Sequence, residues 1–253
     1  MLKGNWIHKA GFDLLFILAP PFVCLLLVIL FPDYFNQEKE MNYLNWFILV
    51  LLIDVSHVYS SLFRTYFDKN AFEQKKDLFI SIPLLSFVAG VVLYSIHALL
   101  FWRVIAYLAV FHFIRQQYGF MRIYSKNDNQ LKWEKWIDNT MIYGLCIYPI
   151  SYWHLSDNRV FHWFIDGDFF KFHNPFLLQI FSLLYYLLIG IYLVKEINIS
   201  LKNKYFNLGK NLLILGTGLS WYFGIVYFNG DLIFTLLNVV AHGIPYIALV
   251  WIV

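Results

Sequence analysis

LFISIPLLSFVAGVVLYSIHALLFWRVIAYLAVF, residues 78–111, is the stretch of this chain that decides its fold. About 20 apolar residues are enough for a helix to cross the roughly 30 Å hydrocarbon layer of a bilayer, so this run is too long for one crossing. The segment His97–Arg103 is the only polar break within it where the chain can turn. Because backbone polar groups in lipid must be satisfied internally, the stretch predicts two membrane-spanning helices joined by a tight turn.

The rest of the chain has the same character. Of its 253 residues, 60% are hydrophobic and 14% are charged, whereas a soluble domain has about a quarter of its residues charged. The apolar runs are solid rather than alternating, which excludes a β-barrel. We therefore predict an all-α, polytopic transmembrane helical bundle that forms a single integral membrane domain over residues 1–253. Its eight spans are expected near residues 12–31, 43–63, 78–96, 102–121, 136–152, 176–194, 211–228 and 232–253.

Lysine and arginine alternate between the two sides of this predicted topology. They gather before the first span and after the second, fourth and sixth: Lys3 and Lys9; Arg64, Lys69, Lys75 and Lys76; Arg122, Lys126, Lys132 and Lys135; Lys195, Lys202, Lys204 and Lys210. The other loops are poor in basic residues and include Asp33, Glu38 and Glu40. The positive-inside rule then places both termini in the cytoplasm, with the chain in the cytoplasmic (inner) membrane. Because topology explains the basic residues, we expect the lipid bilayer as partner and no nucleic acid.

Four further features bear on the architecture. The aromatic outer loop, residues 154–175, is expected to lie on the membrane surface as a cap. Cys24 and Cys146 lie within apolar runs, so we expect buried hydrophobic side chains rather than a disulfide or a metal site. Arg64 and Asp68, spaced i,i+4, are predicted to pair. No basic residue follows the last span before Val253, which fits either a natural or a truncated C-terminus.

Polar residues interrupt three of the predicted spans, each on one helical face. They are Asp54, His57, Ser61 and Arg64 in the second span, His112, Arg115, Gln116 and Gly119 in the fourth, and Asn238 and His242, followed by Pro245 and Tyr246, in the eighth. All three spans run inward, and counting at about 1.5 Å per residue places the three histidines roughly 15–20 Å below the outer boundary. We therefore predict that they share one layer near the midplane.

Ionisable groups at membrane depth are costly and mark function by default. Three imidazoles and a carboxylate from separate helices can hold a transition metal, and imidazole suits iron, copper and zinc alike. The predicted metal ligands are Asp54, His57, His112 and His242. Arg115, Gln116 and Tyr246 are predicted to orient ligands or substrate, and Asn238, Gln116 or Gln117 to hydrogen-bond the ligating imidazoles.

The strings DVSHVYSSLFRTY (54–66), HFIRQQYG (112–119) and NVVAHGIPY (238–246) together resemble a group of uncharacterised bacterial membrane proteins, some of them labelled β-carotene monooxygenases. The chain resembles more distantly the bacterial Brp/Blh carotene dioxygenases, polytopic proteins whose membrane-embedded histidines hold iron. The resemblance implies iron, oxygen and a carotenoid substrate. The paired H-x-x-x-H and Pro-His-Gly elements of the dioxygenases are not found here, since Asn238 stands four residues before His242.

The leading hypothesis is thus a metal-dependent, oxygenase-like oxidoreductase that acts on a hydrophobic small molecule, with iron as the expected metal and copper or zinc as alternatives. A proton-coupled transporter that uses the same residues as a relay, with Asp54 and Arg115 as alternating partners, is a second hypothesis. A haem protein with two histidine ligands and a structural membrane subunit are the others. The sequence leaves open the substrate, the oligomeric state and whether the three helices are neighbours.

Overall fold

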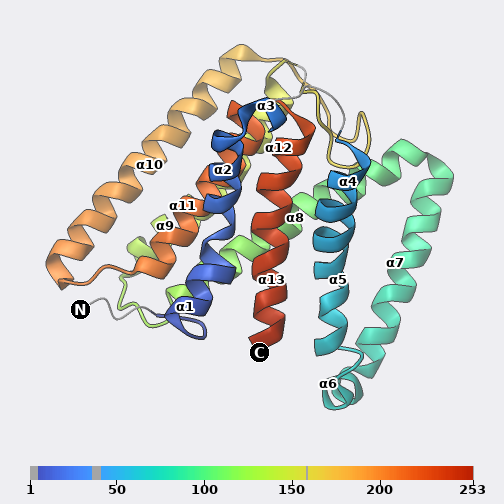
Figure 1. Ribbon diagram of the computed structural model, residues 1–253, viewed down its shortest axis with the longest axis horizontal. Coiled ribbons are helices and arrows are strands. Elements are labelled where there is room, and N and C mark those ends of the chain that lie inside the picture. Colours follow the sequence, from blue (N-terminus) through green and yellow to red (C-terminus); the bar gives the residue numbers. More distant parts are fainter. Residues whose placement is uncertain (1–4, 36–40, 158, 253) are drawn as a thin grey trace.

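The computed structural model describes residues 5–35, 41–157 and 159–252, and within these ranges the chain consists of helices and loops without a β-strand (Figure 1). Lys3, Glu38, Glu40 and Val253, which contribute to the loop-charge pattern and to the last predicted span, lie outside the described residues. The predicted all-α class is confirmed.

Within the described residues, helix accounts for most of each of the eight predicted spans. The short opening elements are α1 (Ala10–Phe12), η1 (Asp13–Leu18), α2 (Pro20–Leu30), α3 (Pro32–Phe35), α4 (Tyr43–Trp46), η2 (Phe47–Val55), α5 (Ser56–Ser60), η3 (Ser61–Arg64) and α6 (Lys69–Gln74). The remaining elements are α7 (Lys76–Ile96), α8 (Ala98–Tyr124), α9 (Lys132–Leu155), α10 (Pro175–Asn203), α11 (Leu208–Trp221), η4 (Tyr222–Tyr227), α12 (Asp231–Thr235), η5 (Leu236–Val240) and α13 (Ala241–Ile252). Several of these abut and form continuous helices.

Five continuous helices of the described chain are long and apolar enough to cross a membrane: Tyr43–Arg64, Lys76–Ile96, Ala98–Tyr124, Pro175–Asn203 and Asp231–Ile252. The pair Ala10–Leu18 and Pro20–Leu30 makes a sixth if it counts as one span bent by 53°. Pro20 and Pro21 account for the bend, because proline removes a backbone donor and its ring clashes with the preceding turn. Helix α9 and the α11–η4 helix are not among the helices that are long and apolar enough to cross a membrane.

The turn within residues 78–111 falls at His97. Helix α7 ends at Ile96 and α8 begins at Ala98. His97 is extended, and its Nδ1 accepts a hydrogen bond of 3.2 Å from the N–H of Leu99, which caps the start of α8. The predicted helical hairpin is confirmed.

The last helix, Asp231–Ile252, lies inside the bundle, whereas α7 lies at its edge (Figure 1). In an 18-residue apolar stretch of the last helix, 61% of the residues are buried, compared with 0% in the corresponding stretch of α7. α13 packs against η1, α2, α5 and α8, and α7 packs against α8 and α6. The helix that carries His242 is therefore held on several sides.

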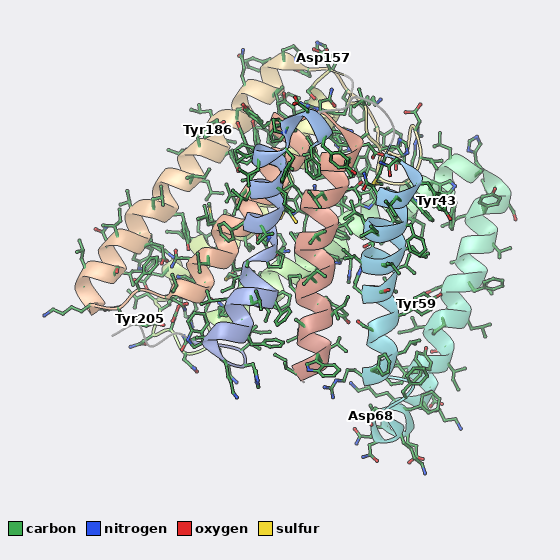
Figure 2. The ribbon with its side chains drawn as sticks, viewed as in Figure 1. Tyr43, Tyr59, Asp68, Asp157, Tyr186 and Tyr205 are labelled. Atoms are coloured by element: carbon green, nitrogen blue, oxygen red, sulfur yellow. The ribbon has the colours of Figure 1, made fainter. Side chains whose placement is uncertain are left out.

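The loops gather at the two ends of the bundle. Asp157 lies at one end and Asp68 and Tyr205 at the other (Figure 2). Helix α1 and the end of α13 both lie at the second end (Figure 1).

The aromatic loop of residues 156–174 is partly inserted into its end of the bundle. Phe161 and Phe169 are buried against Trp153 and Phe234 rather than spread over the surface. Burial raises the pKa of the Asp168 carboxyl above its usual value, although the backbone N–H groups of Phe164 and Ile165 donate to this carboxylate and lower it. The loop is thus buried in part, since Phe170 and Phe172 remain 45% and 60% exposed.

Two of the expected inner-loop lysines are buried inside the bundle. Lys195 on α10 and Lys210 on α11 are each 2% exposed. Lys195 pairs with Asp138 on α9, and the Lys210 Nζ lies 2.6 Å from Glu196 and 3.3 Å from Asp138. The assignment of these two lysines to loops was wrong, since each has carboxylates from neighbouring helices as partners. We call Asp138, Lys195, Glu196 and Lys210 the charge network.

The predicted pair of Arg64 and Asp68 does not form. The Arg64 guanidinium donates to the carbonyl of Val250 from Nε and Nη2, at 3.1 and 3.0 Å. Asp68 instead caps α6, because its carboxylate accepts from the N–H of Ala71 at 3.1 Å. The 3₁₀ turn and loop between them break the helical spacing on which the prediction rested. Cys24 and Cys146 are buried free thiols, as expected.

Candidate metal centre

The structure brings together three histidines from helices far apart in the sequence. One ligand atom each from His57, His112 and His242 lies within 4.8 Å of the others. The Nε2 atoms of His57 and His242 are 3.1 Å apart, and the His112 ring centroid lies 5.0 Å from that of His242 and 6.1 Å from that of His57. Helices α5, α8 and α13 therefore converge at the three histidines.

The local backbone sets two of these histidines just after π-helical segments. η2 ends at Val55, two residues before His57, and η5 ends at Val240, two residues before His242. π-Helical turns within α-helices are rare and are frequent at functional sites. Both segments shift the register of the helix immediately before the histidine that faces the cluster.

His242 is held by contacts on two sides. Its ring stacks on Phe113 of α8, with centroids 3.6 Å apart and planes 7° from parallel. The Gln116 Nε2 donates a hydrogen bond of 2.7 Å to the backbone carbonyl of His242. These contacts fix both the ring plane and the helix that carries it.

Asp54 lies behind His57 rather than among the imidazoles. Its Oδ1 is 3.3 Å from the Nδ1 of His57, while the Nε2 of His57 faces His242. The two atoms are close but poorly aligned, and neither has a hydrogen-bond partner. The arrangement differs from the predicted ligand role of Asp54 and suits an acceptor that orients the His57 ring.

The donor atoms fit a transition-metal ion. Two nitrogens that bind one ion at about 2.1 Å lie at most about 4.2 Å apart. The Nε2 atoms of His57 and His242, which are hydrogen-bonded to each other at 3.1 Å, are within this limit, and an ion would replace that hydrogen bond. A spacing of up to 4.8 Å to the third histidine requires a small side-chain rotation. The Nδ1 of His242 and the Oδ1 of Asn238, one turn earlier, are both buried without a partner. An ion bound at Nε2 would leave these two atoms without a partner, so they call for an ordered water instead.

The three residues predicted to orient ligands or substrate are not equivalent. Gln116 contacts the backbone at His242, and the Tyr246 ring centroid lies 5.8 Å from that of His57. Arg115, one turn inward from His112, donates from Nη1 to the hydroxyl of Tyr143 at 2.6 Å. Gln116 and Tyr246 therefore adjoin the cluster, while Arg115 is directed towards α9.

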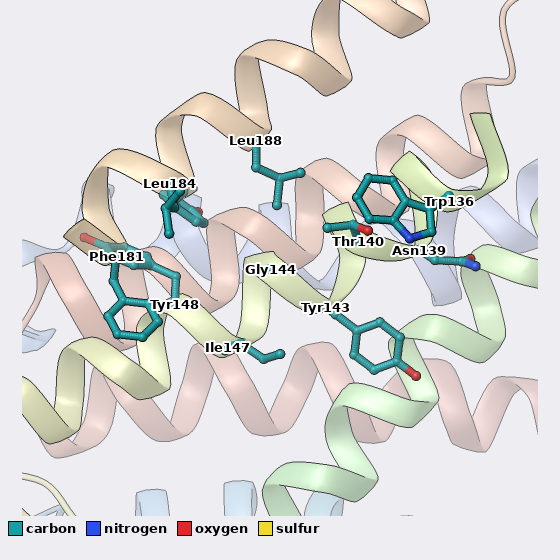
Figure 3. Close-up of a pocket in the computed structure, with 11 residues that line it drawn as sticks. Trp136, Asn139, Thr140, Tyr143, Gly144, Ile147, Tyr148, Phe181, Leu184 and Leu188 are labelled. Atoms are coloured by element: carbon teal, nitrogen blue, oxygen red, sulfur yellow. The ribbon is translucent and has the colours of Figure 1, made fainter. Parts of the chain in front are cut away.

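Tyr143 belongs to a separate hollow of about 360 Å³ between α9 and α10 (Figure 3). Apolar side chains such as Leu184 and Leu188 line the α10 side, and Gly144 faces them from α9 (Figure 3). None of the three histidines lines this hollow, so it is distinct from the candidate metal centre.

Burial differs within the cluster. His57 and His242 are 3% and 1% exposed, whereas His112 is exposed. The centre is thus closed by protein on the α13 side and open on the outer face of α8. Sequence reasoning missed Phe113, because an apolar neighbour of His112 gives no signal of a stacking contact with another helix.

Comparison with known proteins adds no identification. No family model matches this chain, and neither the curated proteins nor the solved structures contain a similar one.

Proposed function

We propose that this protein is a membrane-embedded, metal-dependent oxidoreductase of the oxygenase-like kind, which acts on a lipid-soluble substrate. The observation that carries the proposal is the convergence of His57, His112 and His242. Three imidazoles with open space on one side are a suitable donor set for iron, and for copper or zinc as alternatives. Burial of histidines at membrane depth is costly, which favours a functional reason for placing three of them together.

In this proposal His57, His112 and His242 hold the ion, and Asp54 orients His57 from behind. The bound metal would supply redox and Lewis-acid chemistry. The protein supplies position: Phe113 fixes the ring of His242, and Gln116 fixes its backbone. Neutral imidazole is the ligating form, so metal binding requires that the three rings carry no proton on the ligating nitrogen.

The proposed topology keeps eight spans with both termini in the cytoplasm. α9 and the α11–η4 helix fall short on hydropathy, and they also contribute Asp138 and Lys210 to the charge network. Charged residues inside a membrane protein are expected to face the bundle interior and to pair with one another. These two helices are thus proposed to cross as inner members of the bundle, in the cytoplasmic membrane.

Elemental analysis of the detergent-purified protein tests the metal centre. The wild type is expected to hold near-stoichiometric iron, copper or zinc, and His57→Ala, His112→Ala and His242→Ala are each expected to lose it while remaining folded. His173→Ala is the matched control, since that ring lies in the outer loop with 61% of its side chain exposed. A wild type without metal after reconstitution under reducing conditions would overturn the proposal.

The same samples separate the alternatives. A strong visible absorbance band would indicate haem rather than directly bound metal. Proton uptake into vesicles that contain the metal-free protein, lost in the same histidine variants, would favour the proton-coupled carrier. Loss of stability alone in all three variants would favour a structural role.

A further inference from the structure

The outer face of α8 is exposed along the part that carries His112. Leu108 and Phe111 are 56% and 60% exposed, and His112 and Arg115 are exposed as well. The core-facing side chains of α8, such as Phe113, point elsewhere on the helix. Residues 108, 112 and 115 follow the i, i+4, i+7 spacing of one helical face, so the imidazole lies in the middle of an uncovered stripe.

At its outer end this stripe continues into an apolar groove of about 780 Å³ between α7 and α8. The α8 wall includes Phe101, Ile105 and Leu108, and the α7 wall includes Phe87 and Val91. Leu108, at the inner end of the groove, is one turn from His112. The apolar chain of a ligand that lies in this groove and continues inward along the stripe would therefore reach the candidate metal centre.

At its inner end the stripe carries two guanidinium groups. Arg115 and Arg122 are seven residues apart on one face, and neither forms an ion pair within the described part of the chain. The Nη1 of Arg122 is buried and has no hydrogen-bond partner. Gly119 stands between them, and a Cβ added there would meet nothing within 4 Å. Arg115 donates from Nη1 to the Tyr143 hydroxyl, so its remaining N–H groups and the unpartnered Nη1 of Arg122 are available to an anionic partner near the inner end of α8.

We propose that this stripe binds an amphiphile with a single apolar chain and an anionic oxygen headgroup, either a carboxylate or a phosphate. The headgroup contacts Arg115 and Arg122, and the chain runs outward past His112 into the groove between α7 and α8. Guanidinium recognises carboxylate and phosphate through charge-assisted, often bidentate hydrogen bonds. The proposal names the substrate class of the metal centre, and in that respect it rests on the proposed function.

The geometry also restricts which part of the ligand's apolar chain faces the metal centre. At about 1.5 Å per residue, His112 lies about 4.5 Å along the helix from Arg115 and about 15 Å from Arg122. The carbon that lies beside the imidazoles is therefore in the part of the chain nearer the headgroup. The apolar tail beyond it fills the groove.

Binding of radiolabelled palmitate, hexadecyl phosphate and hexadecanol to the detergent-purified full chain tests this proposal. The two anions are expected to bind more tightly than the alcohol. Arg115→Gln and Arg122→Gln are each expected to lower anion affinity about tenfold or more, and Arg115→Lys to retain most of it. A stronger preference for palmitate indicates a fatty acid, and a stronger preference for hexadecyl phosphate indicates a phosphate ester with a single chain.

Three further variants serve as controls and as a test of the groove. Leu108→Trp is expected to weaken all three probes, because it fills the inner end of the groove. Leu183→Trp and Lys202→Gln, at exposed positions on α10, are expected to change nothing. Equal affinity for anions and alcohol, or equal loss in Lys202→Gln, would overturn the proposal. A third outcome would also overturn it. If the wild type is a dimer, and Leu108→Trp dissociates this dimer without changing palmitate binding, a second copy of the protein occupies the groove.

Metal content measured on each variant keeps the two proposals separate. The arginine and leucine variants are expected to retain wild-type metal content, because they leave the three imidazoles intact. Anion binding without any metal would contradict the proposed function but support the amphiphile site. Metal binding without a preference for anions would support the proposed function but contradict the amphiphile site.

Discussion

Two groups of polar side chains lie inside this bundle, and they differ in how completely they are satisfied. In the charge network, Lys210 contacts both Glu196 and Asp138, and the Nδ2 of Asn211 donates to Glu196 at 2.8 Å. In the histidine cluster, the Nδ1 atoms of His57 and His242 have no hydrogen-bond partner. The charges of the network are thus paired with one another, whereas in the histidine cluster the Nε2 atoms of His57 and His242 bond to each other and their Nδ1 atoms are unused.

This difference assigns the two regions different roles. A buried charge that meets its counter-charges fixes the relative positions of the helices that carry it, here α9, α10 and α11. A buried polar atom without a partner lowers stability, and its retention points to binding of something else. Judged by buried charge alone, the charge network would be the stronger candidate for a functional site. Judged by buried atoms that have no hydrogen-bond partner, the histidine cluster is the stronger candidate.

Breaking the charge network is expected to have the largest effect on stability. Asp138→Asn leaves Lys195 and Lys210 short of a counter-charge inside the bundle and is expected to cost about 3–5 kcal/mol. Denaturant unfolding in detergent measures this cost. The neighbouring Asn139→Ala is the control, since the Oδ1 of Asn139 has no partner to lose. A cost below about 1 kcal/mol for Asp138→Asn would mean that the network does not hold the helices together.

The histidine cluster is expected to respond to its ligand instead. Ferrous iron under anaerobic conditions, at 100 times its dissociation constant, should stabilise the wild type by about 2.7 kcal/mol. A chelator should remove the gain, and His242→Ala should show none of it. The control His173→Ala should behave as the wild type in the same unfolding assay. Stabilisation that persists in His242→Ala would place the metal elsewhere.

The helices could be predicted because hydropathy acts locally. The turn at His97 follows from the length of one apolar run, without reference to any other part of the chain. The fate of Lys195 could not be predicted in this way, because its partner Asp138 is 57 residues distant. A lysine that ends an apolar run has the same local pattern whether it meets water or a carboxylate on the next helix.

Residue counting predicts a shared layer for the histidines but not their lateral arrangement. Counting residues from each span boundary placed His57, His112 and His242 in one layer, and only the packing of α5, α8 and α13 shows that they are neighbours. The spacing of Asp54 and His57 puts both on one face, yet at i,i+3 the carboxylate reaches the near nitrogen of the same imidazole. Sequence spacing alone does not separate a ligand from a residue that orients one.

Asp54→Ala distinguishes these two roles and is expected to have a smaller effect than loss of a histidine. If Asp54 orients His57, metal affinity falls about 10–100-fold while one ion still binds at saturation. Titration with iron, followed by elemental analysis at saturation, measures both quantities. Abolished binding at all concentrations would show instead that the carboxylate is a ligand.

The smallest effect is expected at the end of the helix that carries His57. Arg64→Gln removes the contacts of the guanidinium with the Val250 carbonyl, and an exposed hydrogen bond contributes only about 1 kcal/mol. The variant should therefore unfold slightly earlier than the wild type and keep its metal. The contact joins the ends of η3 and α13, whereas His57 and His242 meet at 3.1 Å, further along the same two helices. If metal affinity fell as far in Arg64→Gln as in Asp54→Ala, the cluster would depend on how these helix ends are held, and its unsatisfied atoms would no longer suffice to mark it as an independent site.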